Sequence, residues 1–328
     1  MKKHDAAPSV VIEGVGELIK TEQIQSLWSG YGEISRYVLV GNASQRYVLK
    51  HVTLPDQANH PRGWNTDLSH QRKVTSYHVE TAWYRNFSHQ CDALCRVPRC
   101  VHLSSSDIEF LMVLEDLDAS GFSSRRTSAS LADMKACLRW LANFHALFMT
   151  EQPQGLWPKG TYWHLGTRPD ELEAMSDLKL KAAAPSIDQI LTDCPFQTLV
   201  HGDAKLANFC FTEAVDDLPK VAAVDFQYVG GGCGMKDVAY FIGSCLDEQG
   251  CEQHHKALLN HYFDVLKQAL LYRDQGINPD EVEQAWRPLF DVAWADFHRF
   301  LQGWSPDHWK LHGFSVRLTQ KVLDNLFV

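Results

Sequence analysis

The sequence has little positive charge, no long apolar run and no repeated or low-complexity tract. Its 31 Lys and Arg residues face 40 Asp and Glu residues, which gives a net charge of −9. This balance disfavours a nucleic-acid partner, because proteins of that class present clustered basic side chains to phosphates. No apolar stretch approaches the roughly 18 residues of a membrane-spanning helix, so we expect no membrane association.

A disulfide framework and a secretory signal are also missing. The nine cysteines are odd in number and scattered, which suits a reducing compartment. Residues 1–11 begin with a basic pair but lack the apolar core of a signal peptide. We therefore expect a cytoplasmic protein. With 328 residues, 45% of them apolar, the chain is long enough for one large domain or two smaller ones.

The amino-terminal third is rich in strand patterns. Two runs typical of strands, 34–40 and 46–52, flank the turn-forming tetrapeptide 41–44 and predict a hairpin. The apolar periodicity of 70–87 predicts a helix, and 110–117 predicts a buried strand that meets acidic residues at its end.

Helical patterns dominate from about residue 128. A helix is expected over 130–149, with Ser130 and Asp133 as a capping pair. The stretch 221–226 predicts a short buried strand, and nearly everything after it is helical. We therefore predict an α+β architecture with two lobes. Its parts are a small β-rich lobe over 1–114, a hinge over 115–121 and a larger, mostly helical lobe over 122–328.

The stretch HGDAKLAN, 201–208, concentrates acid, base and amide groups between apolar flanks. Phosphoryl transfer to a hydroxyl needs a carboxylate to accept the proton, oxygen ligands for Mg²⁺ and cations for the phosphates. Asp203 is the candidate base, and Lys205 is placed to neutralise the transferring group. Asn208 and Asp225 are candidate metal ligands, because a hairpin between them would return Asp225 beside Asn208. A polar turn with a satisfied histidine is the competing interpretation.

The order His201-Gly-Asp203, Asn208 and then Asp225 after a short hairpin resembles the H-G-D-x-x-x-x-N loop of the aminoglycoside phosphotransferases and choline kinases. The similarity extends from about residue 28 to 245. Three further segments resemble the ecdysteroid kinase-like branch of this superfamily: 115–122, 141–148 and 160–171.

The resemblance implies a protein-kinase-like fold that binds ATP in the cleft between two lobes. It implies that Asp203 is the catalytic base, that Asn208 and Asp225 bind magnesium, and that His201 supports the loop. Lys205 departs from the aminoglycoside pattern, where histidine is common. A contact between Lys205 and the phosphate remains chemically sensible.

The resemblance also implies a lysine on a strand of the small lobe that holds the phosphates and pairs with a helix glutamate. Lys50 and Glu80 occupy the corresponding positions. The competing interpretation is that both are solvated side chains, since Lys50 ends an alternating strand and Glu80 lies on the polar side of the helix pattern.

The remaining nucleotide contacts are weaker predictions. Gly30 and Gly32 form a G-x-G that would cover the phosphates, although an ordinary turn explains it nearly as well. Glu115 and Leu117 lie in the hinge, where backbone groups would bond the adenine edge. Asp237 is either a helix cap or, by resemblance, an anchor for the backbone of the catalytic loop.

These observations favour a kinase that transfers the γ-phosphate of Mg-ATP to a hydroxyl of a small acceptor such as an amino alcohol, aminoglycoside, sugar or sterol. A pseudokinase without turnover and a protein kinase are the alternatives. The latter is disfavoured because the strand ends in Asp225-Phe226-Gln227 and not in D-F-G.

The aromatic segment 293–309 suits either a cationic amine, by cation–π contact, or a helical core, which we favour. The residues specify no oligomeric state.

Overall fold

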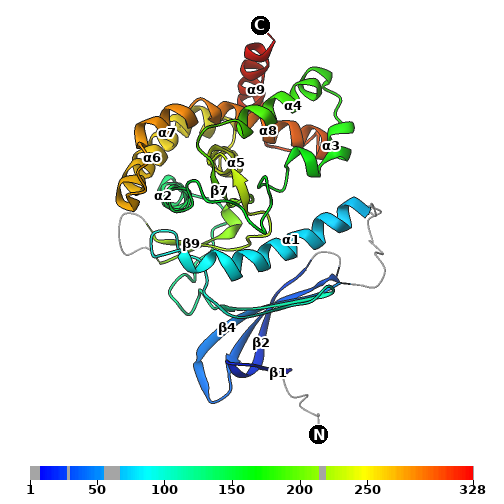
Figure 1. Cartoon of the computed structure of the whole chain (residues 1–328), viewed down its shortest axis with the longest axis vertical. Coiled ribbons are helices and arrows are strands. Elements are labelled where there is room, and N and C mark those ends of the chain that lie inside the picture. The colour runs from blue at the N-terminus through cyan, green and yellow to red at the C-terminus, as the bar shows by residue number, and fades with distance from the viewer. Residues whose placement is uncertain (1–7, 28–29, 55–66, 214–218, 328) are drawn as a thin grey trace.

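The computed structural model describes residues 8–27, 30–54, 67–213 and 219–327 (Figure 1). An antiparallel sheet of six strands in the order β1-β2-β3-β4-β6-β5 forms the amino-terminal lobe. Its strands are β1 (Ser9–Ile12), β2 (Gly16–Ser26), β3 (Gly32–Leu39), β4 (Asn42–Thr53), β5 (Cys100–Ser105) and β6 (Glu109–Glu115).

The predicted hairpin is formed by β3 and β4. Its turn is shorter than expected, because β4 already begins at Asn42 and only Val40 and Gly41 separate the strands. Lys50 lies inside the sheet, opposite Ile34 of β3 and Met112 of β6. A side chain at this position of a central strand is fixed by two neighbouring strands.

Helix α1 (Asp67–Asn86) crosses between the sheet and the helical lobe (Figure 1). Its predicted apolar face is confirmed, since Val79, Trp83 and the following Phe87 are buried. The Trp83 ring stacks on Phe226 of the helical lobe, with 4.4 Å between the ring centroids. Tyr84 also meets Phe226, so the two lobes share aromatic contacts directly after Asp225.

The carboxyl-terminal lobe is mostly helical, which confirms the predicted α+β, two-lobed architecture. Two small antiparallel pairs, β7 with β10 and β8 with β9, accompany the helices. No helix of the described residues is long and apolar enough to cross a membrane. The elements are α2 (Leu131–Leu147), α3 (Pro169–Glu173), α4 (Leu178–Thr192), β7 (Thr198–Val200), β8 (Phe209–Phe211), β9 (Val221–Ala223), β10 (Gly230–Gly232), α5 (Met235–Cys245), α6 (Glu248–Arg273), α7 (Pro279–Trp286), α8 (Leu289–Trp304) and α9 (Gly313–Leu326).

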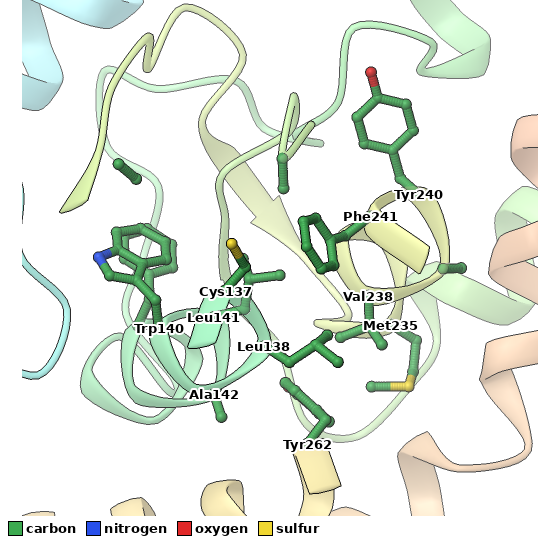
Figure 2. Packing of buried hydrophobic residues seen from close by; sticks show 14 of the residues in the cluster. Cys137, Leu138, Trp140, Leu141, Ala142, Met235, Val238, Tyr240, Phe241 and Tyr262 are labelled. Atoms are coloured by element: carbon green, nitrogen blue, oxygen red, sulfur yellow. The ribbon is translucent and has the colours of Figure 1, made fainter. Parts of the chain in front are cut away.

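Helix α2 forms the centre of this lobe. The predicted capping pair is present, because the Ser130 hydroxyl accepts from Asp133 N and the Asp133 carboxylate accepts from Ser130 N. Leu138 of α2 packs with residues of α5 and with Tyr262 of α6 (Figure 2). Helix α5 is thereby fixed in the core, with the hydroxyl of Tyr240 turned away from the cluster (Figure 2).

We predict that Trp83→Ala lowers the free energy of unfolding by about 3–5 kcal/mol, the usual cost of truncating a fully buried tryptophan. Urea denaturation measures this change. The control is Leu271→Ala, which alters an exposed side chain of α6 and should stay within about 0.5 kcal/mol of wild type. A Trp83→Ala effect as small as that of the control would contradict the packing.

Candidate active site

The loop after β7 is held by Asp237, in the first turn of α5. The Asp237 carboxylate accepts hydrogen bonds from His201 N at 2.6 Å and from Gly202 N at 2.9 Å. It also lies 3.2 Å from Nε2 of His145 in α2. The helix cap is Gly234, so of the two interpretations of Asp237 the structure supports the backbone anchor.

The His201 ring joins this loop to the strand segment that precedes Asp225. Its Nε2 lies 3.0 Å from Val224 O, and Asp203 N donates to its Nδ1 at 3.3 Å. This pattern assigns the proton to Nε2 and leaves the ring neutral. Both ring nitrogens are occupied by backbone groups, so His201 orders the loop and is not placed to accept a substrate proton.

Gly202 is required by its surroundings. Its φ is +79°, in the region that glycine tolerates, and a Cβ atom would lie 2.0 Å from Tyr228 O. Tyr162 N donates to Gly202 O at 3.2 Å. The loop backbone is therefore clamped between the segment around Tyr162 and the segment around Tyr228.

Asp203 is buried, with both carboxylate oxygens engaged. Oδ2 accepts from Lys205 Nζ at 2.7 Å and from Asn208 Nδ2 at 3.1 Å, and Oδ1 accepts from Tyr240 Oη at 2.9 Å. Burial raises the pKa of Asp203, and Lys205 offsets part of that rise. Burial opposes the charge of Lys205, but the attraction of Asp203 outweighs it and raises the Lys205 pKa.

Asp225 lies next to Asn208, as the predicted β8–β9 hairpin requires. Val224 N donates to Asn208 O at 3.0 Å. The backbone of Asp225 is left-handed, with φ +69°. Its Oδ1 is buried and has no hydrogen-bond partner among the described residues. Burial opposes ionisation, but nearby ammonium groups, that of Lys50 first, outweigh it and lower the Asp225 pKa.

Lys50 and Glu80 form a buried ion pair. Lys50 Nζ lies 2.6 Å from Glu80 Oε2 and 3.9 Å from Asp225 Oδ1. Burial opposes the charge of Lys50, but the two carboxylates outweigh it and raise the Lys50 pKa. The competing interpretation of Glu80 as a solvated side chain is wrong, because its side chain is only 2% exposed. It faces the sheet because Lys50 is there to neutralise it.

Lys73 is a further cation near Lys50 that sequence reasoning did not single out. Its Nζ donates to Gln227 Oε1 at 2.9 Å and lies 4.8 Å from the Tyr77 ring centroid. It forms no ion pair within the described part of the chain. Burial, and then repulsion by Lys50, lower the Lys73 pKa to about 8. Its position seven residues before Glu80, on the same helix face, was the available signal.

The two glycines lie at the turn between β2 and β3. The turn is closed by Leu27 N donating to Gly32 O at 2.8 Å. Gly32 has φ +145°, and a Cβ there would lie 1.9 Å from His51 O, so strand pairing alone explains this glycine. Residues 28 and 29 lie outside the described residues. Phosphate contact by Gly30 and Gly32 stays a prediction.

Of the two residues predicted for the hinge, Glu115 is the last residue of β6 and Leu117 lies two residues after it. The Glu115 carboxylate pairs with Arg96 Nη2 at 2.5 Å. Leu117 is buried, and its carbonyl accepts from Ser120 N and Phe122 N. Adenine contacts by Glu115 and Leu117 stay a prediction.

The aromatic segment 293–309 divides between core and surface. Trp294 and Asp296 are buried, and the Asp296 carboxylate is held by Arg299 and by Trp163 Nε1. The helical-core interpretation that we favoured applies to these two residues. Trp309 is exposed, so an aromatic surface remains beside the loop.

The sequence matches the model of the ecdysteroid kinase-like family over residues 63–155 and 163–273. The match covers more than half of the chain. The chain therefore belongs to this family, as the resemblance of its motifs indicated. No curated protein sequence matches it significantly.

Solved structures of small-molecule kinases are similar to this chain at low sequence identity. An aminoglycoside phosphotransferase from Streptomyces rimosus is 14% identical with a TM-score of 0.46, covering 83% of this chain and 92% of that one. An ethanolamine kinase from Plasmodium vivax is 13% identical with a TM-score of 0.44, covering 98% and 82%. A choline kinase from Streptococcus pneumoniae is 13% identical with a TM-score of 0.42, covering 94% and 93%.

We predict that Asp237→Asn lowers the free energy of unfolding by about 1–3 kcal/mol, because one buried backbone N–H then meets an amide NH₂ and loses its acceptor. Urea denaturation and amide exchange at His201 and Gly202 measure the effect. Asp177→Asn is the matched control, since Asp177 caps α4 by accepting from Leu180 N and Asn caps equally well. Equal effects of the two variants would refute the anchor.

Proposed function

We propose that this member of the ecdysteroid kinase-like family transfers the γ-phosphoryl group of Mg-ATP to a hydroxyl of a small molecule. The observation that carries the proposal is the environment of Asp203, whose two oxygens are fixed by Lys205, Asn208 and Tyr240. Lys50 and Asp225 lie in the same cleft, 3.9 Å apart. These groups are the base, cations and oxygen ligands that phosphoryl transfer needs.

Asp203 serves as the base. Its raised pKa brings its proton affinity closer to that of the reacting hydroxyl. The acceptor oxygen forms a bond to the γ-phosphorus as the bond from that phosphorus to the β–γ bridging oxygen breaks. The hydroxyl proton passes to Asp203, and ADP leaves. Lys205, paired with Asp203 at 2.7 Å, faces the negative charge of the transferring group.

Lys50 and Lys73 hold the nucleotide phosphates. Glu80 orients the Lys50 ammonium. Within the described residues, Lys73 has an amide oxygen and a ring face as partners and no ion pair. A partly buried cation without a carboxylate is costly, and a polyphosphate supplies the missing negative charge. Lys73 and Lys50 repel each other, and an anion that binds between them stabilises the charge of both.

The residues present suit a magnesium ion. Asp225 offers a buried carboxylate oxygen without a hydrogen-bond partner, and Asn208 offers an amide oxygen beside it. Mg²⁺ favours such hard ligands and usually takes further oxygens from phosphates and water. No group of three or more His, Cys, Asp and Glu side chains forms a metal site among the described residues, so phosphate oxygens would complete the coordination. When bound, the metal neutralises phosphate charge.

We predict that Asp203→Asn lowers acceptor-dependent ADP release by a factor on the order of 10²–10⁴, the contribution of a general base. The assay uses Mg-ATP with choline, ethanolamine, aminoglycosides, sugars, hydroxylated sterols and simple alcohols. Asp274→Asn is the control, because Asp274 ends α6 in a left-handed conformation that Asn tolerates.

Three outcomes separate the candidate functions. Stimulation by one acceptor class that disappears in Asp203→Asn supports the kinase. Full activity of that variant excludes Asp203 as the base. Tight binding of Mg-ATP without stimulation by any acceptor, and without slow hydrolysis, supports a pseudokinase.

We predict that Lys73→Met weakens Mg-ADP binding at pH 7 on the order of tenfold, because a charge-assisted contact to phosphate is lost. With its pKa lowered to about 8, Lys73 is charged at pH 7 and neutral at pH 9. The affinity of wild type for Mg-ADP should therefore fall between pH 7 and pH 9 by more than the affinity of Lys73→Met does. Calorimetry at both pH values measures this difference.

The control for this experiment is Lys256→Met, which alters an exposed residue of α6. It should bind Mg-ADP as wild type does at both pH values. If Lys73→Met also binds as tightly as wild type at pH 7, Lys73 does not contact the phosphates.

A further inference from the structure

The ammonium of Lys310 lies against three aromatic rings. Its Nζ is 5.0 Å from the Tyr240 ring centroid, 5.4 Å from that of Phe297 and 5.6 Å from that of Trp309. These distances are typical of cation–π contacts. Lys310 belongs to the short segment between α8 and α9, which places a positive charge on the aromatic surface described above.

This aromatic cage adjoins the proposed base. Tyr240 supplies one wall of the cage, and its hydroxyl donates to Asp203 Oδ1 at 2.9 Å. Burial lowers the pKa of Lys310 to about 8, and the charges of Asp203 and Lys205 act on it. Tyr240 therefore lies between the Lys310 ammonium and the proposed base, in contact with both.

Among the described residues, the Lys310 ammonium has no partner in a hydrogen bond or an ion pair. Lys179 also lies over a ring, that of Phe327 at 5.6 Å, but it pairs with Asp324. An ammonium carries three donors, and Lys310 is only partly buried, so an oxygen of a bound molecule can replace water as the acceptor of a charge-assisted hydrogen bond.

We propose that Lys310 determines the class of acceptor. Its ammonium fills the cage where an amine of an acceptor would otherwise lie, and it donates to an oxygen of the molecule that binds. The acceptor is then an uncharged or acidic hydroxyl compound, and a cationic amino alcohol is excluded. This inference rests on the proposed function, because it assigns the acceptor pocket to the side of Asp203 that Tyr240 lines.

The charges around the cage favour the same conclusion. Asp203 is already paired with Lys205, so it has little negative charge to offer a second cation. The Asp296 carboxylate, which could have attracted an amine, is held by Arg299 at 2.8 Å. A cationic acceptor would therefore meet two ammonium groups and no unpaired carboxylate of the cage. Like charges brought together in this way disfavour binding.

The test uses two alcohols of the same shape. Choline and 3,3-dimethylbutan-1-ol differ in one atom, a quaternary nitrogen in place of a quaternary carbon, and so in one positive charge. Their affinities are measured by ligand-observed NMR titration in the presence of Mg-ADP. We expect wild type to bind the uncharged alcohol at least about tenfold more tightly than choline.

Two variants at position 310 separate charge from packing. Lys310→Met keeps the length of the side chain and removes its charge, so the preference should shrink to less than about threefold or reverse, as the rings become available to choline. Lys310→Arg keeps the charge and should keep the preference. Lys179→Met, which removes another lysine that lies over a ring, should leave the preference unchanged.

Equal binding of the two alcohols by wild type, including detectable binding of neither, overturns the inference. So does a preference that Lys310→Met leaves intact. These binding measurements need no turnover, so they stand whether or not ADP is released. A retained preference for the uncharged alcohol together with no ADP release from any acceptor would instead refute the proposed function.

Discussion

The carboxylate of Asp237 is the contact on which the geometry of the cleft depends. The residues from His201 to Lys205 lie outside regular helix and strand, so no ladder of backbone hydrogen bonds fixes them. Asp237 accepts from two consecutive backbone N–H groups of that loop. It stands on α5, which is packed into the largest apolar cluster of the lobe. The rigidity of the core thereby reaches Asp203 through two buried side chains of α5, Asp237 at the loop backbone and Tyr240 at the Asp203 carboxylate.

The two acidic groups of the cleft are pushed in opposite directions. Burial raises the pKa of Asp203, whereas the ammonium groups around Asp225 overcome burial and lower its pKa. Separation of this kind assigns different roles to chemically identical groups. A carboxylate that accepts a proton benefits from the raised value. A carboxylate that binds a cation benefits from staying ionised at every pH at which the protein is folded.

The sequence predicted much of the fold and of the cleft, and its errors share a physical cause. The hairpin with Lys50, the capping pair of α2 and the return of Asp225 beside Asn208 follow from local patterns and short connections. A solvated Glu80 stayed open as the alternative to the predicted pair with Lys50, because helix periodicity assigns charged residues to solvent and only a partner from a distant strand makes its burial tolerable. Such pairings are set by tertiary packing, which one sequence does not reveal.

The same limit explains the three residues that were missed: Lys73, Tyr240 and Lys310. Each lies in or beside a helix whose sequence pattern predicts only a buried apolar residue or an exposed surface residue at that position. Lys73 and Tyr240 acquire a partner only when α1 and α5 meet the segments around Asp225 and Asp203. Lys310 acquires its aromatic surroundings only when the segment after α8 packs beside α5.

Helix α1, more than the sheet, determines how far the Lys50 ammonium lies from Asp225. Two neighbours of Asp225 bind this helix, Phe226 by stacking on Trp83 and Gln227 by accepting from Lys73. The same helix carries Glu80, which holds the Lys50 ammonium. Because both contacts lie directly after a residue with left-handed backbone, they also hold Asp225 in a conformation that the residue would otherwise avoid. Aromatic contacts to Phe226 and hydrogen bonds to Gln227 thus place the cation of one lobe near the carboxylate of the other.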